Sequence, residues 1–429
     1  MHWLIPAAAI LQSATAQQPF PGDLNSTFST TGPHNVRFDT GTYGPAVEEV
    51  HYYYDQWPIG VAVSKTGRIF ACYTRGDYDY TLGEIVNTTA ETAYPSLELN
   101  TPPGGLSTEF NGIPFGSADQ DHFISVQAIF VTPDDTLWVL DTGRPTINQS
   151  TSPVMVYGQP GGPKLVAVNL TTNTISKTYT LPADVHFPDS YMNDLRFDQR
   201  PNATESGGGI AYIVDSSDEG RTGFIVIDLG TGESWRHLTQ HPSTLRGPED
   251  VPSYQGLPFY YRSEGNPVNF LQEGLDGEEL SLYGDILYYS PLSTDYIYSI
   301  ETEYLRVNPK TDPLALKRAF DNVKNLGQRG GNANGFSGDS LGNVYMLMPE
   351  QNGIFIYNST TLQAEPYVRD PRIIWPDSSN VGFDGYIYFN INQLPYQPNW
   401  NDGVDGRVHP GLILRAKLPD GANKNMLLM

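Results

Sequence analysis

The sequence contains a single cysteine, Cys72, among 429 residues. One cysteine excludes an intramolecular disulfide, a cysteine-based zinc site and CxxC redox chemistry. Because Cys72 lies within the apolar run 68–73, we expect a small buried side chain rather than a reactive thiol. No disulfide framework is therefore available to hold the fold together.

Basic residues are scarce as well. The chain has 25 Lys and Arg against 48 Asp and Glu, which gives a net charge of −23. Such a chain is repelled by nucleic-acid phosphates and by anionic membrane surfaces. Beyond the N-terminus there is also no apolar run of about 18 residues that could span a bilayer. The sequence therefore predicts neither a nucleic-acid partner nor a membrane partner.

Common catalytic motifs are missing too. The sequence has no GxSxG, HExxH, EF-hand loop or P-loop, so serine hydrolases, zinc proteases and nucleotide-dependent enzymes have no motif support. What the chain does contain is 42 Gly, 34 Pro and 12% aromatic residues. This composition is typical of a globular protein rich in loops.

The N-terminus predicts export. Residues 3–11 form a short apolar run, and Ala-Thr-Ala at 14–16 is a pattern that signal peptidase accepts. We therefore expect residues 1–16 to be a signal peptide and 17–429 to be the mature chain. N-glycosylation sequons support a secreted, extracellular glycoprotein, and they begin at Asn25, Asn87, Asn148, Asn169, Asn202 and Asn358.

One pattern recurs along the chain. A strand-like apolar run leads to a Gly or Asp turn, and a second strand then opens with an apolar and aromatic pair. Its aromatic markers are Phe70, Trp138, Tyr212, Tyr288, Tyr345 and Tyr388. Helical periodicity is scarce, with one candidate helix in 313–326. Six units of four strands predict an all-β, six-bladed β-propeller, which we expect to be one domain closed by the two ends of the chain.

The markers also align the blades. Counting back 11 residues, with allowance for insertions in two blades, reaches the predicted start of each innermost strand. These six positions are Ile59, Gln127, Asn193, Asp276, Asn334 and Asp377. Equivalent side chains should converge at one mouth of the central channel and form a ligand-binding ring there. The alternative is that short polar residues at strand starts only satisfy free backbone groups.

Two histidines are candidate proton-transfer groups. Asp121 and His122 directly precede the innermost strand of the second blade, and His186 precedes that of the third. A histidine beside a carboxylate is a common proton shuttle, so we expect one of these side chains to overhang the same mouth. The competing interpretation is that all three are ordinary residues of surface loops.

Several segments resemble the Yellow/major royal jelly protein family. They are residues 124–131, 137–143, 192–198, 211–216, 287–292 and 335–345, and the similarity extends from about residue 45 to residue 415. The resemblance implies a secreted six-bladed propeller, in a family that includes dopachrome-converting enzymes, carriers of amines and lipid-like ligands, and nutritive proteins. Insect members generally carry several cysteines, so the single Cys72 suggests a fungal branch.

The predicted ring is also similar to the oxygen-rich mouth of calcium-dependent gluconolactonases. Asn193 and Asp276 occupy comparable places and are the candidate metal ligands, with waters completing a Ca²⁺ site. The first blade, however, offers Ile59 where that family uses an acidic ligand. A tightly held catalytic metal is therefore not expected, although Ca²⁺ binding stays open.

Two classes of function fit this sequence. The first is an enzyme that isomerises or otherwise rearranges a small oxidised aromatic or secondary metabolite by proton transfer, with no cofactor required. The second is a binding protein for an amine, in which Asp276 and Asp377 would pair with the cation. A calcium-dependent lactonase is a further alternative.

Overall fold

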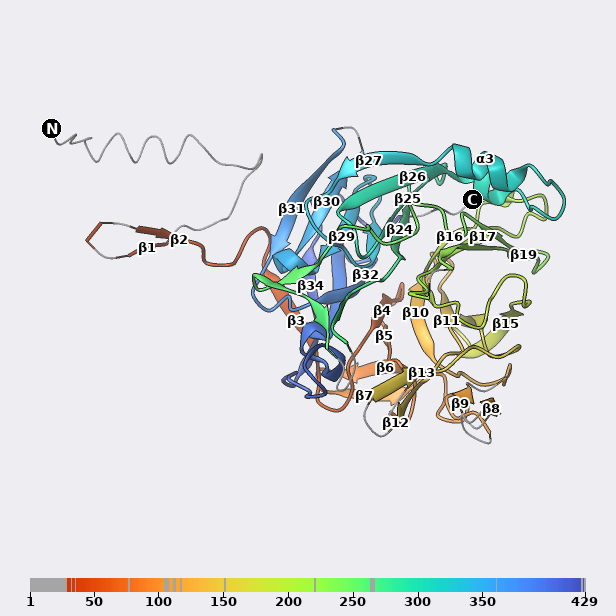
Figure 1. Ribbon diagram of the computed structural model, residues 1–429, viewed down its shortest axis with the longest axis horizontal. Helices are drawn as coiled ribbons and strands as arrows, with labels where there is room; N and C mark the ends of the chain where they lie inside the picture. The colour runs from red at the N-terminus through yellow and green to blue at the C-terminus, as the bar shows by residue number, and fades with distance from the viewer. Residues whose placement is uncertain are drawn as a thin grey trace.

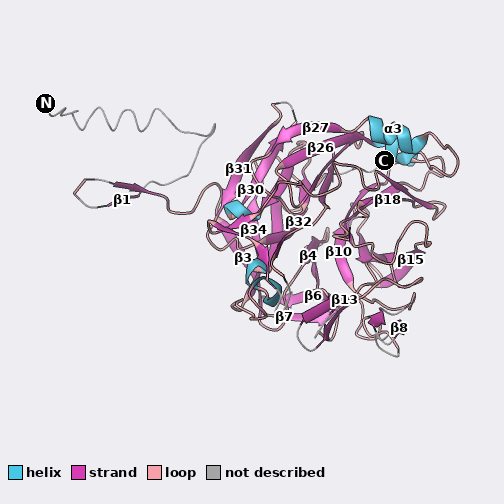
Figure 2. Ribbon diagram, in the orientation of Figure 1, coloured by secondary structure: helices cyan, strands magenta, loops and turns pink. Residues whose placement is uncertain are grey.

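Four-stranded antiparallel sheets dominate the computed structural model (Figures 1 and 2). It describes residues 29–425 and 427, apart from 32, 35, 76–77, 104–107, 111–112, 116–117, 150–151, 220, 263–266 and 360. The signal-peptide prediction for 1–16 and the sequon at Asn25 fall outside these residues. Within the described part of the chain, no helix is long and apolar enough to cross a membrane.

The six sheets are the blades of a β-propeller, as predicted. From the innermost strand outward, blade 1 consists of β4 (Gly60–Val63), β5 (Ile69–Cys72), β6 (Leu82–Asn87) and β7 (Ala90–Ala93). Blade 2 consists of β10 (Val126–Val131), β11 (Thr136–Asp141), β14 (Lys164–Asn169) and β15 (Thr174–Thr180). In the same order, blade 3 consists of β16 (Met192–Asp198), β17 (Ile210–Asp215), β18 (Gly223–Asp228) and β19 (Ser234–His237). Blade 4 consists of β24 (Leu275–Leu280), β25 (Ile286–Pro291), β26 (Tyr296–Glu301) and β27 (Lys324–Gln328). Blade 5 consists of β28 (Phe336–Gly338), β29 (Val344–Met348), β30 (Gly353–Asn358) and β31 (Gln363–Arg369). Blade 6 consists of β32 (Pro376–Val381), β33 (Tyr386–Ile391), β34 (Gly411–Lys417) and β3 (Val47–Tyr53).

The remaining elements are short. Small hairpins are β1 (Ser29–Thr31) with β2 (Val36–Phe38), β8 (Thr108–Phe110) with β9 (Ile113–Phe115), β12 (Thr146–Gln149) with β13 (Ser152–Met155), β20 (Ser253–Tyr254) with β21 (Leu257–Pro258), and β22 (Tyr260–Tyr261) with β23 (Asn269–Phe270). The helices described are α2 (Thr302–Arg306) and α3 (Ala315–Asp321), and α3 lies inside the predicted helical segment. Four 3₁₀ turns also occur, at Pro201–Ala203, Pro349–Gln351, Leu394–Tyr396 and Pro398–Trp400.

The repeated turn explains why the pattern of paired strands could be recognised in the sequence. Gly67 and Gly385 join the first two strands of their blades with φ of 83° and 80°, and Asp135 takes the same left-handed conformation with φ of 62°. Glycine adopts this conformation without a Cβ penalty, and Asp tolerates it better than most residues. After the turn, the second strand is buried on both faces between neighbouring blades, as in β17. A continuous apolar run is therefore required there.

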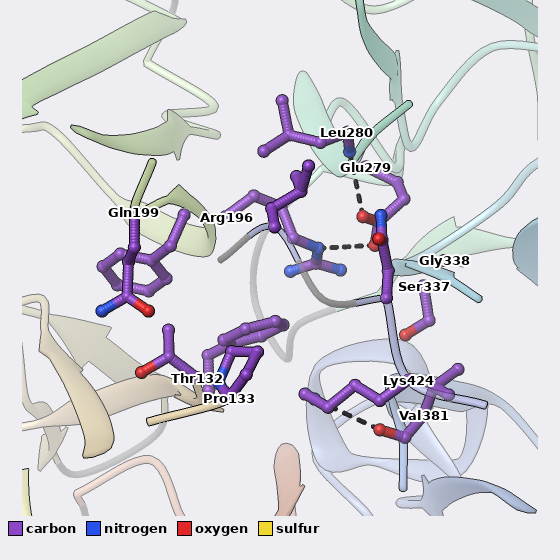
Figure 3. A pocket seen from close by; sticks show the side chains of 14 residues that line it. Thr132, Pro133, Arg196, Gln199, Glu279, Leu280, Ser337, Gly338, Val381 and Lys424 are labelled. Carbon is purple, nitrogen blue, oxygen red and sulfur yellow. Dashed lines mark hydrogen bonds and ion pairs between the residues drawn. The ribbon is translucent and has the colours of Figure 1, made fainter. Parts of the chain in front are cut away.

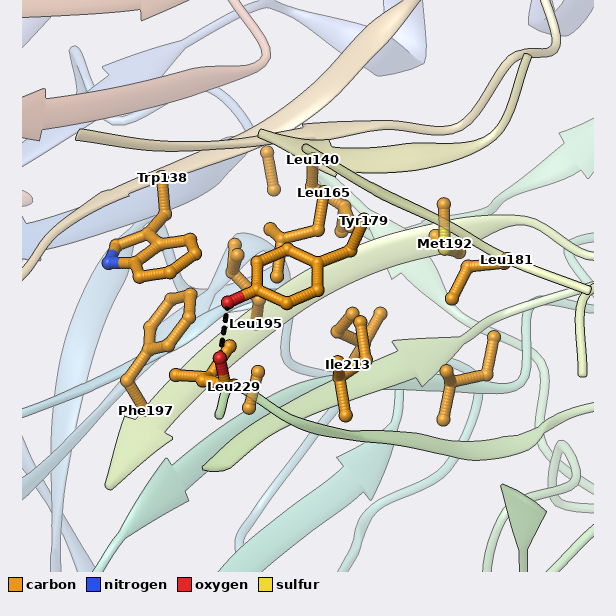
Figure 4. Packing of buried hydrophobic residues seen from close by; sticks show 14 of the residues in the cluster. Trp138, Leu140, Leu165, Tyr179, Leu181, Met192, Leu195, Phe197, Ile213 and Leu229 are labelled. Carbon is orange, nitrogen blue, oxygen red and sulfur yellow. Dashed lines mark hydrogen bonds between the residues drawn. The ribbon is translucent and has the colours of Figure 1, made fainter. Parts of the chain in front are cut away.

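Neighbouring blades pack through large side chains. In the seam between blades 2 and 3, Trp138 stacks on Phe197 with 4.6 Å between ring centroids, and the hydroxyl of Tyr179 donates to the carbonyl of Leu229 at 2.7 Å (Figure 4). Cys72 lies in the seam between blades 1 and 2, where its fully buried thiol points to the carbonyl of Gln127 at 3.3 Å. This is the small buried side chain that the sequence predicted.

Blade 6 closes the ring. Its outermost strand is β3, from the N-terminal side of the repeats, which pairs antiparallel with β34 from the C-terminal side. The prediction that the ends of the chain meet is confirmed, and the sequence did not show that β3 completes the last blade. Side chains then tie blade 6 to blade 1: the amide of Val63 donates to Asn380 Oδ1 at 3.3 Å, and Asn390 Nδ2 donates to the carbonyl of Pro58 at 2.8 Å.

The innermost strands end around Lys424, which comes from the C-terminal segment (Figure 3). Lys424 Nζ donates to the carbonyl of Val381 at 3.2 Å and lies 4.5 Å from the ring centroid of Phe130. Beside it, Arg196 donates to Glu279 at 2.9 Å. Burial lowers the pKa of the Lys424 amine to about 7. Only about 30 Å³ of free space is left among these side chains, enough for one or two waters.

Removing β3 tests the closure. We expect a chain of residues 39–429 to melt like the full chain, and a chain of residues 55–429 to melt lower by more than about 5 °C. The shorter chain leaves the backbone groups of β34 unpaired at an open edge and removes the buried ring of Tyr53. Circular dichroism melting is the measurement, and equal midpoints would contradict this account of closure.

Candidate active site

A cavity of about 1020 Å³ opens where the innermost strands begin. Five of the six positions aligned in the sequence line it: Ile59, Gln127, Asn193, Asp276 and Asp377. Each lies just before the start of an innermost strand or one residue into it, so the shared register brings them to one end of the axis. Large clefts of this kind are the usual binding sites of small molecules.

Hydrogen bonds join three of these side chains in one direction. Gln127 Nε2 donates to Asn193 Oδ1 at 2.8 Å, and Asn193 Nδ2 donates to Asp276 Oδ1 at 2.7 Å. The chain of hydrogen bonds therefore crosses from blade 2 to blade 4 and ends on a carboxyl oxygen. Because the Asn193 amide is fixed at both of its ends, it helps to orient the Asp276 carboxyl group, which lines the cavity.

Asn334 is the member of the aligned set that does not line the cavity. It is fully buried, and its Nδ2 donates to the carbonyl of Pro376 at 2.6 Å. This contact links blades 5 and 6 next to Asp377, which itself accepts from Asn392 Nδ2 at 2.9 Å. For Asn334, the bond to the backbone matches the alternative interpretation of polar strand-start residues.

Three carboxyl groups of the cavity have raised pKa values. Burial is the largest cause for each, and repulsion from neighbouring carboxylates adds to it. The pKa of Glu273 rises to about 8 and that of Asp377 to about 7, while the pKa of Asp276 is raised well above its usual range. Groups that titrate near neutral pH can both accept and release protons under physiological conditions.

Two arginines line the same cavity, but their charges are already engaged. Arg144 donates to the carbonyls of Val156 and Asp189 at 3.0 and 2.6 Å and pairs with Glu219 at 3.3 Å. Arg407 pairs with Asp405 at 2.6 Å and lies 4.6 Å from the ring centroid of Trp57. Among the described residues, neither arginine nor any other basic side chain forms an ion pair with Glu273, Asp276 or Asp377.

Aromatic side chains from two long loops form much of the wall. The loop between β19 and β24 supplies Tyr261, and the loop between β33 and β34 supplies Trp400, whose ring centroid is 4.2 Å from that of Tyr261. The loops are also joined through Asn399, whose carbonyl accepts from the amide of Arg262 at 2.8 Å. Trp57, Tyr78 and Tyr191 complete the aromatic wall from the side of blades 1 to 3.

The predicted proton-transfer residues lie elsewhere. Asp121 is exposed, and His122 is held by Asp119, whose Oδ2 lies 3.0 Å from His122 Nδ1. His186 is buried beside Gly158, and burial lowers its pKa to about 4. None of the three lines the cavity, because the turns before β10 and β16 carry them away from the axis. The structure therefore does not bring them to the ring.

The proposed calcium ligands, Asn193 and Asp276, are bonded to each other in the structure. The Asn193 amide is used on both sides, by Gln127 and by Asp276. Ca²⁺ requires six to eight oxygen ligands, and the described residues contain no group of three or more His, Cys, Asp or Glu side chains arranged to hold a metal. The side chains present at the mouth fit a polar organic ligand better than a Ca²⁺ ion.

Several cavity residues were not singled out from the sequence. Tyr191 lies two residues before Asn193 and Glu273 three before Asp276, so the segments leading into the innermost strands held this signal. Asn392 follows the end of β33 and has no counterpart in the aligned register. The loop residues around Trp400 had no periodic pattern from which their position could be predicted.

Comparison with known proteins identifies the family. The family model described as "Major royal jelly protein" matches residues 124–377, more than half of the chain. The chain belongs to the major royal jelly protein family. The match begins just before β10 and ends at Asp377, so the family segment includes all five polar positions of the aligned set.

The relatives of this family member include the Drosophila protein yellow. That of Drosophila madeirensis is 28% identical over 297 residues, which cover 68% of this chain and 42% of the relative. That of Drosophila melanogaster is 25% identical over 300 residues, covering 68% and 44%. The matched part of this chain thus spans less than half the length of these relatives.

Solved structures of similar shape are more distant. A luciferin-regenerating enzyme has a TM-score of 0.47 at 11% identity, covering 89% of this chain and 97% of that one. Virginiamycin B lyase from Staphylococcus aureus has a TM-score of 0.43 at 12% identity, covering 87% and 99%. A Xanthomonas campestris gluconolactonase has a TM-score of 0.44 at 9% identity, covering 94% and 99%. The propeller fold of this family member is assigned from its own sheet topology.

The raised pKa of Asp377 predicts a pH-dependent stability. Because its folded-state pKa is about 7 against an ordinary value of 3.8, ionisation opposes folding: the penalty is absent below about pH 4, grows as the pH rises from about 4 to about 7, and is constant above that. Asp377→Asn cannot ionise, so it should match the parent protein near pH 4 and be more stable at pH 8 by a few kcal/mol, at about 1.4 kcal/mol per pKa unit.

Thermal midpoints of both proteins at the two pH values test this expectation. Asp420→Asn, which changes an exposed carboxyl outside the cavity, is the matched control and should show no such pH-dependent gain. A difference between Asp377→Asn and the parent that is equal at pH 4 and pH 8 would contradict the assignment.

Proposed function

We propose that this protein is an enzyme that isomerises or rearranges an oxidised aromatic or related secondary metabolite by proton transfer in the central cavity. The observation that carries the proposal is the trio of Glu273, Asp276 and Asp377, which line an aromatic-walled cavity and form no ion pair among the described residues. A volume of about 1020 Å³ accommodates a ligand larger than a single aromatic ring.

The chemistry needs only groups of this chain. Asp377, held by Asn392 and titrating near neutral pH, is suited to take a proton from one carbon of the ligand and return it to another. The aromatic wall can position a planar ring, and Asp276, fixed by Asn193, can hold a polar group beside it. Such a rearrangement consumes no oxidant or reductant, so no cofactor is required.

A carrier of an organic amine is the second candidate. It is favoured by the charge balance of the cavity. Arg144 and Arg407 each form an ion pair with a carboxylate of their own, whereas Glu273, Asp276 and Asp377 form no ion pair among the described side chains. An ammonium group bound there would favour the ionised carboxylates and could also rest against the aromatic rings. A calcium-dependent lactonase receives less support, because the Asn193 amide already bonds to Gln127 and Asp276 and the described residues hold no cluster of three or more His, Cys, Asp or Glu placed for a metal.

Turnover measurements separate these candidates. We expect conversion of a member of a panel of aminochromes and lactones, unaffected by EDTA, and a rate that rises with pH through about 7 as Asp377 ionises. Asp377→Asn should lower the rate by about 10²-fold or more, as loss of a general base does, whereas Asp420→Asn should not. Binding of amines in calorimetry without any turnover would establish the carrier function instead.

We also infer that the protein is exported and glycosylated, and the single Cys72 continues to favour a fungal source. Asn87, Asn169 and Asn358 are the last residues of β6, β14 and β30, and Asn202 follows β16. All four are exposed, and by strand direction all lie at the end of the propeller opposite the cavity. Glycans there would leave the cavity mouth open. The side chain of Asn148 lies outside the described part of the structure.

Mass measurement of secreted protein tests export. We expect a chain that begins near Gln17, a mass that falls on glycosidase treatment, and glycopeptides at the four exposed asparagines. An intact Met1 together with an unchanged mass would overturn the inference.

A further inference from the structure

Tyr191 occupies a fixed position in the wall of the cavity. Its backbone amide donates to Asp215 Oδ1 at 2.9 Å, and its carbonyl accepts from the amide of Ser216 at 2.8 Å. Asp215 is itself fully buried and paired with Arg236 at 2.8 Å. The backbone of Tyr191 is therefore held on both sides by a buried network, at a position from which its side chain lines the cavity.

The phenol of Tyr191 shares the cavity with the three carboxyl groups. Burial is the main cause that raises its pKa well above the usual value, and the charges of Glu273, Asp377 and Asp276 add to it. Arg144, which also lines the cavity, acts in the opposite direction. The residues that influence this hydroxyl are therefore cavity residues, and the hydroxyl keeps its proton across the physiological pH range.

We propose that Tyr191 is a catalytic residue that donates a hydrogen bond to a carbonyl oxygen of the ligand. The ligand would then contain a carbonyl group in addition to its cationic or polar group. This assignment rests on the function proposed above and specifies its substrate class. Around the strand starts, the amides of Gln127, Asn193 and Asn392 already donate to neighbouring side chains. A carbonyl oxygen needs a donor, and the neutral phenol of Tyr191 beside these groups provides one.

The proton and the electron pair balance in this scheme. Ionised Asp377 removes a proton from the carbon next to the carbonyl, and the electron pair of that C–H bond forms a C=C bond as the carbonyl oxygen becomes an enolate. Tyr191 stabilises the enolate through its O–H without giving up the proton. Asp377 then returns its proton to a different carbon of the conjugated system, and the carbonyl re-forms, which leaves an isomer of the ligand and an unchanged enzyme.

Calorimetry with two probes tests the assignment without requiring the natural substrate. The probes are phenylethylamine and its para-carboxamide, which adds a carbonyl to the same amine. We expect the intact protein to bind the carboxamide more tightly, and Tyr191→Phe to weaken the carboxamide about tenfold while changing phenylethylamine by less than about twofold. Tyr283→Phe, at an exposed tyrosine outside the cavity, is the matched control and should change neither.

The outcomes distinguish this inference from the function on which it rests. Asp377→Asn should weaken both probes alike, because both carry the amine. If the intact protein binds both probes equally, or if Tyr191→Phe weakens both by the same factor, the role of Tyr191 is refuted and the cation site stands. If neither probe binds, the assignment of Tyr191 and the amine carrier both fail, and turnover of the aminochrome and lactone panel decides the enzyme proposal separately. Thermal midpoints confirm folding of each variant, and Tyr191→Phe keeps the ring that packs in the wall.

Discussion

Backbone pairing between β3 and β34 holds the ring of blades shut, and the cavity depends on it. Each innermost strand contributes one position to the aligned set, so these positions meet only when all six blades are fixed around one axis. The links from Asn380 and Asn390 across to blade 1 show how closely the last blade must approach the first. A ring that opened at this seam would separate Asp377 in blade 6 from Ile59 and Gln127 in blades 1 and 2.

The cavity concentrates groups that oppose folding. Burial, with repulsion from nearby carboxylates, raises the pKa values of Glu273, Asp276 and Asp377 in a protein whose net charge is already −23. Amides such as Asn193 and Asn392 bond to the carboxyl oxygens of Asp276 and Asp377 and so help the scaffold to tolerate these buried groups. Groups that lower the stability of the fold but can take part in chemistry are expected at a functional site.

The repeat and the turns made the fold predictable, because both are local. A positive φ after the first strand demands Gly or Asp, and a strand between two blades demands apolar residues, so the blades could be aligned without any long-range information. The same alignment found Gln127, Asn193, Asp276 and Asp377. It could not separate Asn334, whose side chain turns to the backbone of blade 6, and it missed Tyr191, Glu273 and Trp400. Tyr191 and Glu273 lie two and three residues before aligned positions, in segments to which the alignment was not extended, whereas the position of Trp400 depends on an irregular loop that no periodic pattern encodes. For the same reason, His122 and His186 were adjacent to the strands in sequence but remote from the axis in space.

The position of Lys424 affects how a small molecule could reach and leave the axis of the propeller. Lys424 fills the far end of the axis together with Arg196 and Glu279, with room beside it for little more than a water. Among the described residues, the axis is therefore filled at the Lys424 end and open at the cavity end, which is bordered by the loops of Tyr261 and Trp400. A small molecule bound on this axis would have to leave by the end at which it entered, so its release would have to precede the binding of the next one.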